Sequence, residues 1–129
     1  MFSDKEIEYI ETQRLAKIST VTREGLQPDV VPVGFDFDGK ECIFVGGFNL
    51  SKTKKYKNIL GNEKVALVID DLKSVDPWSP RGIKIYGTAN IVARKAQGYL
   101  KGSGHASTEY IRIRPKKKWR WGINEPMFQ

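Results

Sequence analysis

The chain has 129 residues, of which 40% are hydrophobic and 29% charged, a balance typical of one folded domain rather than a disordered chain. Apolar runs such as Val65–Ile69 are too short to cross a bilayer, and Met1–Glu6 mixes acids and bases where a secretion signal would be apolar, so we expect a cytoplasmic protein. The 22 Lys and Arg residues outnumber the 15 Asp and Glu residues, and a net charge of +7 favours an anionic partner such as nucleic acid, anionic lipid or a phosphorylated small molecule.

The first predicted element is a short helix. Ser3 and Glu6 have the spacing of a capping box, in which each side chain satisfies a backbone N–H of the other residue. Tyr9 and Ile10 give the helix an apolar face, and the helical pattern ends at about Arg14. The period then changes to two, which predicts a strand from Leu15 to a turn at residues 23–25.

The next segment reads as a hairpin. Residues 29–37 are rich in β-branched and aromatic side chains, which favours a strand. Pro32 has no N–H to give to a ladder, so we place it at a sheet edge or a bulge. Asp38-Gly39 is a typical hairpin turn, and Cys42–Val45 is predicted to pair back. Cys42 is the only cysteine, so no internal disulfide can form, and we expect a buried structural thiol.

An internal helix is predicted over Ser51–Leu60, with Tyr56, Ile59 and Leu60 facing inward. Gly61-Asn62 follows, and either residue tolerates the left-handed conformation that often ends a helix.

The remaining pattern is β. We predict strands over residues 65–69, 83–92 and 110–114, with a polar loop over residues 70–82, and the last strand resuming beyond Pro115 with Trp119 and Trp121 facing the core. About six closely spaced strands and one internal helix predict one domain over residues 1–129, a closed or nearly closed antiparallel barrel. So small a barrel fills its interior with side chains, so a large ligand would lie outside it, and a dimer interface is a natural place for a cofactor.

Lysines crowd the start of the internal helix. A cation there opposes the helix dipole at a cost of about 0.3–1 kcal/mol, yet Lys52, Lys54 and Lys55 all fall in its first turns. An anion reverses the sign of that cost, because free N–H groups, the dipole and the ammonium groups then converge on it. Ser51 and Thr53 could add hydroxyl donors. A phosphate site and a solvated basic helix face both fit this pattern.

The whole chain resembles the flavin-binding split-barrel superfamily, which includes the pyridoxamine 5′-phosphate oxidases. It is most similar to the short members that depend on deazaflavin (coenzyme F-420). The landmarks, in chain order, are residues 13–16, 31–35, 51–58, 70–72, 76–82, 86–89 and Trp121-Gly122. The resemblance implies a six-stranded antiparallel split β-barrel of Greek-key type with an N-terminal helix and one internal helix.

The resemblance also implies a homodimer that holds its cofactor, FMN or coenzyme F-420, in clefts between the subunits. In that family the strand matching Val31-Pro32-Val33 lays its backbone along the ring system. The helix start matching Ser51, Thr53, Lys54 and Lys55 binds the phosphate. The segment matching Pro80-Arg81-Gly82 closes the site.

The activity implied is an oxidoreductase that transfers hydride between the cofactor and a small organic substrate. The cofactor carries the hydride, so we assign no catalytic acid or base. The Arg-x-His-x-Arg substrate motif of vitamin B6 oxidases is absent from the sequence, and we do not expect that activity. A protein that holds a flavin or haem without turnover remains an alternative.

Two other features could indicate a metal site or a nucleic-acid partner. His105 is the only histidine and has no partner at ligand spacing, so we expect no metal site. Lys116–Trp121 interleaves cations with tryptophans, a pattern that suits single-stranded nucleic acid on a small barrel. We prefer a terminal strand with its bases in solvent, because the tryptophans are two residues apart, and we do not expect a nucleic-acid partner.

Overall fold

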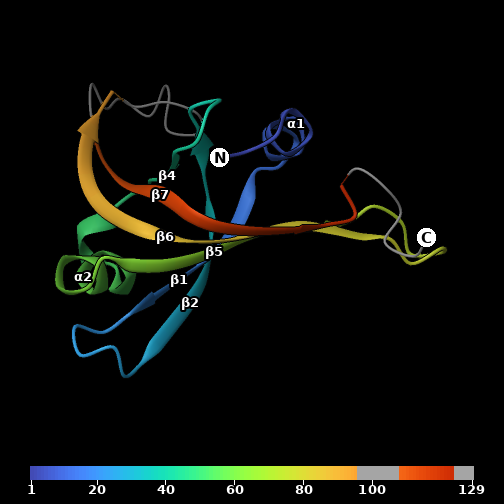
Figure 1. The fold of residues 1–129 in the computed structure, drawn as a ribbon. Coiled ribbons are helices and arrows are strands. Elements are labelled where there is room, and N and C mark those ends of the chain that lie inside the picture. Colours follow the sequence, from blue (N-terminus) through green and yellow to red (C-terminus); the bar gives the residue numbers. More distant parts are fainter. Residues whose placement is uncertain (96–107, 124–129) are drawn as a thin grey trace.

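The computed structural model describes residues 1–95 and 108–123 (Figure 1). Two helices, a 3-10 turn and seven strands follow one another along the chain. They are α1 (Asp4–Thr12), β1 (Leu15–Val21), β2 (Pro28–Gly34), β3 (Asp36–Phe37), β4 (Ile43–Val45), η1 (Leu50–Lys52), α2 (Lys54–Gly61), β5 (Lys64–Leu72), β6 (Pro80–Arg94) and β7 (Thr108–Trp121). No helix in the described part of the chain is long and apolar enough to span a membrane.

The strands form one curled antiparallel sheet in the order β2-β1-β5-β6-β7-β4-β3. The predicted split barrel is confirmed, with seven strands in place of six. The extra strand arises because the predicted strand over residues 29–37 bends at Phe35, whose N–H donates to the Arg14 carbonyl at 3.4 Å. The two edges of the sheet, β2 and β3, are therefore the two arms of one bent segment, and Pro32 lies on an edge strand as predicted.

The helix α1 begins as the sequence predicts. The Ser3 hydroxyl accepts from the Glu6 N–H at 3.2 Å, and the Glu6 carboxylate accepts from the Ser3 N–H at 2.8 Å, which completes the capping box. The helix ends at Thr12, and Tyr9 and Ile10 are buried. Its polar face thus stays in solvent while one apolar stripe covers the sheet.

The internal helix is shorter than predicted. Residues 50–52 form the 3-10 turn η1, and α2 begins only after Thr53, whose hydroxyl accepts from the Tyr56 N–H at 3.3 Å. Ile59 is buried as predicted, but Leu60 is 64% exposed. The predicted left-handed end is also wrong, because Asn62 has extended backbone and its amide side chain turns back to the Thr22 carbonyl.

Two predicted boundaries on the long strands are corrected. The polar loop covers only residues 73–79, because residues 70–72 continue β5 and pair with residues 80–82 of β6. Strand β7 runs unbroken past Pro115, but the β6–β7 register shifts between Tyr86 and Gly87, and Lys116 is the extra residue. A bulge reverses which face later residues point to.

The reversal explains why the prediction for Trp119 is wrong. Strict alternation from the buried Ile113 and Pro115 would put Trp119 inside, whereas after the bulge Lys118 faces inward and Trp119 is 40% exposed. Gly87 permits this arrangement, because a Cβ there would lie 2.3 Å from the Arg114 carbonyl oxygen.

The core fills the inside of the curled sheet and extends beneath α1 and α2. Its fully buried side chains are mostly isoleucines, namely residues 10, 18, 43, 69, 83, 85, 111 and 113. The two helices lie at opposite ends of the molecule, and the turn between β5 and β6 projects at the end away from α2 (Figure 1). This placement decides which predicted site residues can meet within one chain.

Candidate cofactor site

The start of α2 has the donors that an anion needs. The first N–H groups of a helix have no acceptor inside it, and in α2 the Thr53 hydroxyl satisfies that of Tyr56. The N–H groups of Lys54 and Lys55 come earlier in the same turn, which has no acidic residue. The Thr53 hydroxyl itself donates to the Leu50 carbonyl at 2.6 Å, so Thr53 shapes this turn rather than offering a free donor.

The two lysines of this turn differ in their surroundings. Lys54 is exposed, whereas Lys55 is half-buried. Burial lowers the pKa of Lys55, and the negative charge of Asp29 on β2 partly opposes that shift. Asp29 and Val31 lie on the inner side of β2, opposite the buried Thr20 and Ile18 of β1. The start of α2 thus lies close enough to Asp29 for the charge of Asp29 to act on Lys55, and Asp29 precedes the predicted ring segment by two residues on the same strand.

The predicted ring segment lies on the edge strand β2. Val31 is half-buried, Pro32 exposed and Val33 buried. In the described part of the chain β2 pairs with β1 alone, so its other side has backbone groups available to a ligand.

Ser51 lies on the other side of the turn. It lines a hollow of about 470 Å³ together with residues 47–50 and Thr108 and Glu109. Near this hollow, the Tyr56 hydroxyl donates to the Glu109 carboxylate at 3.0 Å, and this acceptor raises the pKa of Tyr56. Ser51 is exposed there and does not belong to the turn that presents Lys54 and Lys55.

The third predicted segment, Pro80–Gly82, lies at the far end of the sheet. Lys64, three residues after α2, pairs with Thr88, whereas Pro80 pairs with Leu72. Eight residues of strand separate these points, which is about 26 Å at 3.3 Å per residue. Figure 1 shows the same separation. This segment therefore does not meet the start of α2 within one chain.

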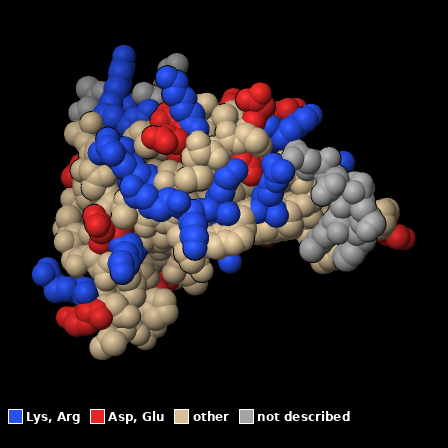
Figure 2. All heavy atoms as spheres, in the orientation of Figure 1, with Lys and Arg blue, Asp and Glu red and all other residues tan. Residues whose placement is uncertain are grey.

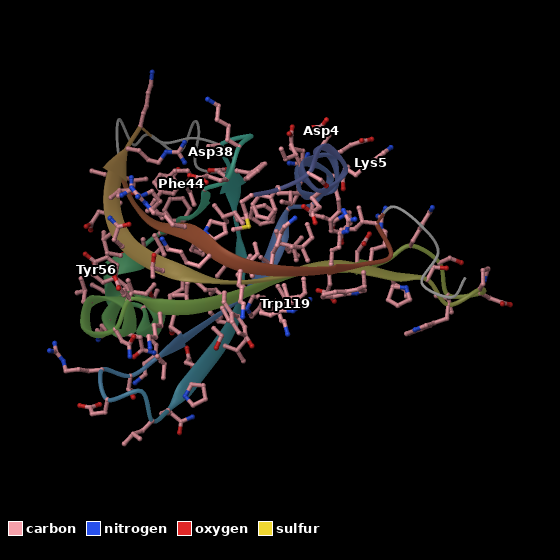
Figure 3. The ribbon with its side chains drawn as sticks, viewed as in Figure 1. Asp4, Lys5, Asp38, Phe44, Tyr56 and Trp119 are labelled. Carbon is pink, nitrogen blue, oxygen red and sulfur yellow. The ribbon has the colours of Figure 1, made fainter. Side chains whose placement is uncertain are left out.

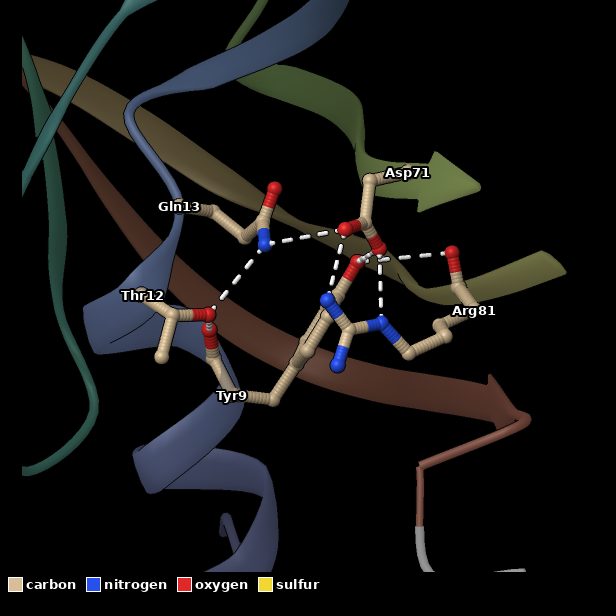
Figure 4. A network of polar contacts seen from close by, with 5 residues as sticks. All are labelled: Tyr9, Thr12, Gln13, Asp71 and Arg81. Carbon is tan, nitrogen blue, oxygen red and sulfur yellow. Dashed lines mark hydrogen bonds and ion pairs between the residues drawn. The ribbon is translucent and has the colours of Figure 1, made fainter. Parts of the chain in front are cut away.

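Arg81 is held in a polar network (Figure 4). Its guanidinium binds the Asp71 carboxylate through two nitrogens, at 2.9 and 2.6 Å, and the Tyr9 hydroxyl donates to Asp71 at 2.9 Å. The Arg81 hydrogen bonds hold the pKa of Asp71 below its usual range, while burial and Asp71 raise the pKa of Tyr9. Asp71 thus holds the Arg81 side chain in one position at this end of the sheet. A Cβ at Gly82 would lie 2.4 Å from Trp121, so Gly82 makes room for that ring.

The outer face of the sheet carries exposed apolar side chains. Leu15 and Val30 are 65% and 67% exposed, and Tyr86 and Trp119 pack edge to face with 4.8 Å between their ring centroids. Figure 3 shows Trp119 beside β7. A hollow of about 290 Å³ between β1, β2, β5 and β6 adjoins Tyr86. Large exposed apolar side chains gathered on one face of a sheet are typical of an interface.

Comparisons with known proteins show the family of this chain. Residues 2–122 match the family model described as pyridoxamine 5′-phosphate oxidase. The chain belongs to this family.

One curated relative in Streptomyces rimosus, a 5a,11a-dehydrotetracycline/5a,11a-dehydrooxytetracycline reductase, is 34% identical over 95% of this chain and 84% of its own length. Two solved structures share the fold. An F420 reductase has a TM-score of 0.60 at 18% identity, and the match covers 83% of this chain and 90% of that protein's chain. A haem storage protein from Vibrio cholerae has a TM-score of 0.67 at 17% identity, and the match covers 92% of this chain and 94% of that protein's chain. Family membership and the reductase together support an oxidoreductase.

The sequence did not predict the residues that hold α1 against the sheet. Tyr9 contacts Asp71 and Arg81 across 62 and 72 residues of chain, and Glu6 pairs with Lys118 and Arg120. For Glu6, the sequence predicted only the capping box with Ser3 and not the ion pairs with β7. Among residues 1–95 and 108–123, no three His, Cys, Asp or Glu side chains gather as a metal site would require. His105 lies outside these residues. Cys42 is partly exposed, not buried as predicted.

Proposed function

We propose that this protein is an oxidoreductase that binds FMN or coenzyme F-420 and reduces or oxidises a small organic substrate by hydride transfer. The observation that carries the proposal is the cationic first turn of α2, which has no acidic residue of its own and whose Lys55 feels the charge of Asp29 on the edge strand β2. One end of this site is suited to a phosphate and the other to a flat ring system.

The donor set fits such a cofactor. Lys54 and Lys55 with their N–H groups would hold the phosphate, and the free edge of β2 at Val31–Val33 would hydrogen-bond the ring system. When bound, the cofactor supplies the hydride, and the protein supplies position and electrostatics. Half-buried Lys55 is surrounded by less water than Lys54, so its attraction for an anion is screened less.

The proposed homodimer rests on where Pro80–Gly82 lies. Within one chain this segment is about eight strand residues away from Lys64, which follows the end of α2, so a contribution to the cofactor site would come from a second copy. The exposed apolar face formed by Leu15, Val30, Tyr86 and Trp119 supports that association, because burying it removes apolar surface from water. Arg81, fixed by Asp71, would then present a rigid wall to the partner's cofactor.

The substrate class is proposed from the relative. The 34% identical protein reduces dehydrotetracyclines, as its name states, so unsaturated polycyclic compounds are the first class to test. Pro32, exposed on the edge strand β2, would leave space for a flat apolar substrate against the ring.

The first experiment identifies the natural cofactor. The purified protein is denatured, and the released small molecule is identified by absorbance and mass. An empty preparation is then offered FMN and F-420 in turn. Release or uptake of either supports the proposal, whereas haem would favour the binding protein without turnover. A protein that accepts neither flavin refutes the proposal.

The second experiment tests the assigned phosphate residues. Replacing both Lys54 and Lys55 by Ala should weaken cofactor binding by about 100-fold, because each charge-assisted contact is worth about 1.5–3 kcal/mol. Lys57→Ala is the matched control, since this exposed lysine lies in the next turn of the same helix, and it should change the affinity by less than about twofold. Equal effects of both variants would contradict the assignment.

A further inference from the structure

A separate hollow of about 460 Å³ lies on the outer face of β6 and β7. Arg112, Arg114 and Lys116 line it from β7, and Thr88, Ala89 and Asn90 line it from β6. Glu63, just before β5, completes the lining. Arg112 and Arg114 face outward by strand alternation, opposite Asn90 and Thr88. Lys116 lies on the same face by the same alternation, because Pro115 is buried and the face changes only after the bulge, from Lys117 on. Three cations of one strand thus lie around one hollow.

None of these three cations is in an ion pair in the described ranges, where the ion pairs use Lys17, Arg81, Lys118 and Arg120. Glu63 is the one acidic residue in the lining, against three cations. Arg112 donates to the Asn90 amide oxygen at 3.3 Å, which orients its guanidinium and adds no negative charge. Figure 2 shows Lys and Arg side chains forming a band over β6 and β7. Like charges held together repel one another, and an anion among them is stabilised.

The hollow continues into an apolar one. A second space of about 420 Å³ is lined by Ile59 and Leu60 of α2 and Ile91 of β6, and both spaces share Glu63 and Asn90. Leu60 is 64% exposed and lies here rather than in the core. The Ala89 N–H donates to the Glu63 carbonyl at 2.8 Å, which ties the end of α2 to β6 where the two spaces meet. Together they form one groove, cationic at one end and apolar at the other.

We infer that this groove binds a small amphipathic organic anion. A carboxylate or phosphate head group would lie among Arg112, Arg114 and Lys116, and an apolar chain or ring would cover Leu60. The groove contains none of the residues assigned to the cofactor phosphate or to its ring. The site is therefore additional to the proposed function and stands independently of it.

The test uses octanoate and octyl phosphate below their micelle concentrations, with acetate as the head group alone. Binding to the full chain is measured by calorimetry and located by amide NMR shifts, which should cluster at residues 59–63, 88–91 and 112–116. Octanoate should bind at least about tenfold more tightly than acetate, because its chain buries apolar area. The tighter of the two eight-carbon ligands identifies the head group. FMN should not displace either ligand.

Three variants decide the outcome. Replacing both Arg112 and Arg114 by Gln should weaken binding of the eight-carbon ligands by at least about tenfold, and Leu60→Ser should reduce the advantage of octanoate over acetate. Lys73→Gln, at an exposed lysine in the β5–β6 turn, should have no effect. Equal affinity of the arginine variant, shifts elsewhere, displacement by FMN, or no binding of either eight-carbon ligand would overturn the inference.

Discussion

The two helices begin in opposite electrostatic ways. The first turn of α1 carries Asp4 and Glu6, which suit the positive end of a helix dipole. Glu6 is only 1% exposed, and Lys118 and Arg120 compensate its charge. The first turn of α2 has two lysines and no acid. The charge that α1 buries is therefore compensated within the chain. The first turn of α2 has no acidic residue to compensate its lysines.

This difference indicates that the start of α1 stabilises the fold, whereas the start of α2 binds a ligand. Every charge that α1 buries has a partner on the sheet, so its contacts contribute to stability alone. The lysines of α2 cost stability in the free protein and regain it only when an anion is bound. Substitutions in α1 should therefore change the free energy of unfolding, and those at the start of α2 should change ligand affinity.

The largest effect is expected from Glu6→Ala. The substitution removes the capping box and leaves the Lys118 ammonium, which is 26% exposed, without its partner. Breaking such a pair together with a cap should lower the free energy of unfolding by about 3 kcal/mol, measured by urea denaturation. Glu8→Ala, exposed on the same helix, should change it by less than about 0.5 kcal/mol. Similar losses in both variants would mean that the pair contributes little.

The same carboxylate should make stability depend on acid. Burial raises the pKa of Glu6, but the hydrogen bonds from Lys118 and Ser3 and the charge of Arg120 outweigh it, and the pKa lies below its ordinary value of 4.5. A lowered pKa gives stability that is present above the ordinary value and is lost as the pH falls through the folded-state value. The difference between the wild type and Glu6→Ala should therefore be constant near pH 7 and shrink below about pH 4.5. A difference that stays undiminished down to the pH at which the wild type unfolds in acid would contradict this.

Tyrosines on the two helices give a smaller contrast. Tyr9→Phe removes hydroxyl contacts to Asp71 and to the Arg81 carbonyl, and should cost about 1 kcal/mol of unfolding free energy. Tyr56→Phe removes an exposed bond to Glu109, and should cost less than about 0.5 kcal/mol. Thermal unfolding of both variants checks the order, and a larger loss at Tyr56 would reverse the comparison.

Local signals in the sequence were enough to predict the elements. The capping box predicted where α1 begins, and alternation predicted most strands. What they could not reveal was the bulge at Lys116, since one extra residue in a ladder depends on the partner strand. That single residue moved Trp119 outward and Lys118 inward, so the predicted core face of the last strand was wrong.

The candidate site was predictable only in part, for a related reason. Lys54 and Lys55 could be found because a run of cations at a helix start violates a local preference. The network of Tyr9, Asp71 and Arg81 could not, because its members are brought together by the sheet register. Chain order also gave no sign that Pro80–Gly82 lies at the opposite end from α2.

Lys54→Glu is expected to change stability only slightly and in the opposite direction, and it tests the comparison most directly. Reversing the charge in the first turn of α2 makes that turn resemble that of α1, so the free energy of unfolding should rise by about 0.5 kcal/mol. Binding of FMN or F-420 should nevertheless fall, because the new carboxylate repels the phosphate. Lys57→Glu, placed further along α2, should lack the gain in stability, since the dipole effect fades beyond the first turn. If Lys54→Glu lowers the free energy of unfolding, the lysine serves the fold of α2. If it raises the free energy of unfolding without weakening cofactor binding, Lys54 does not bind the phosphate.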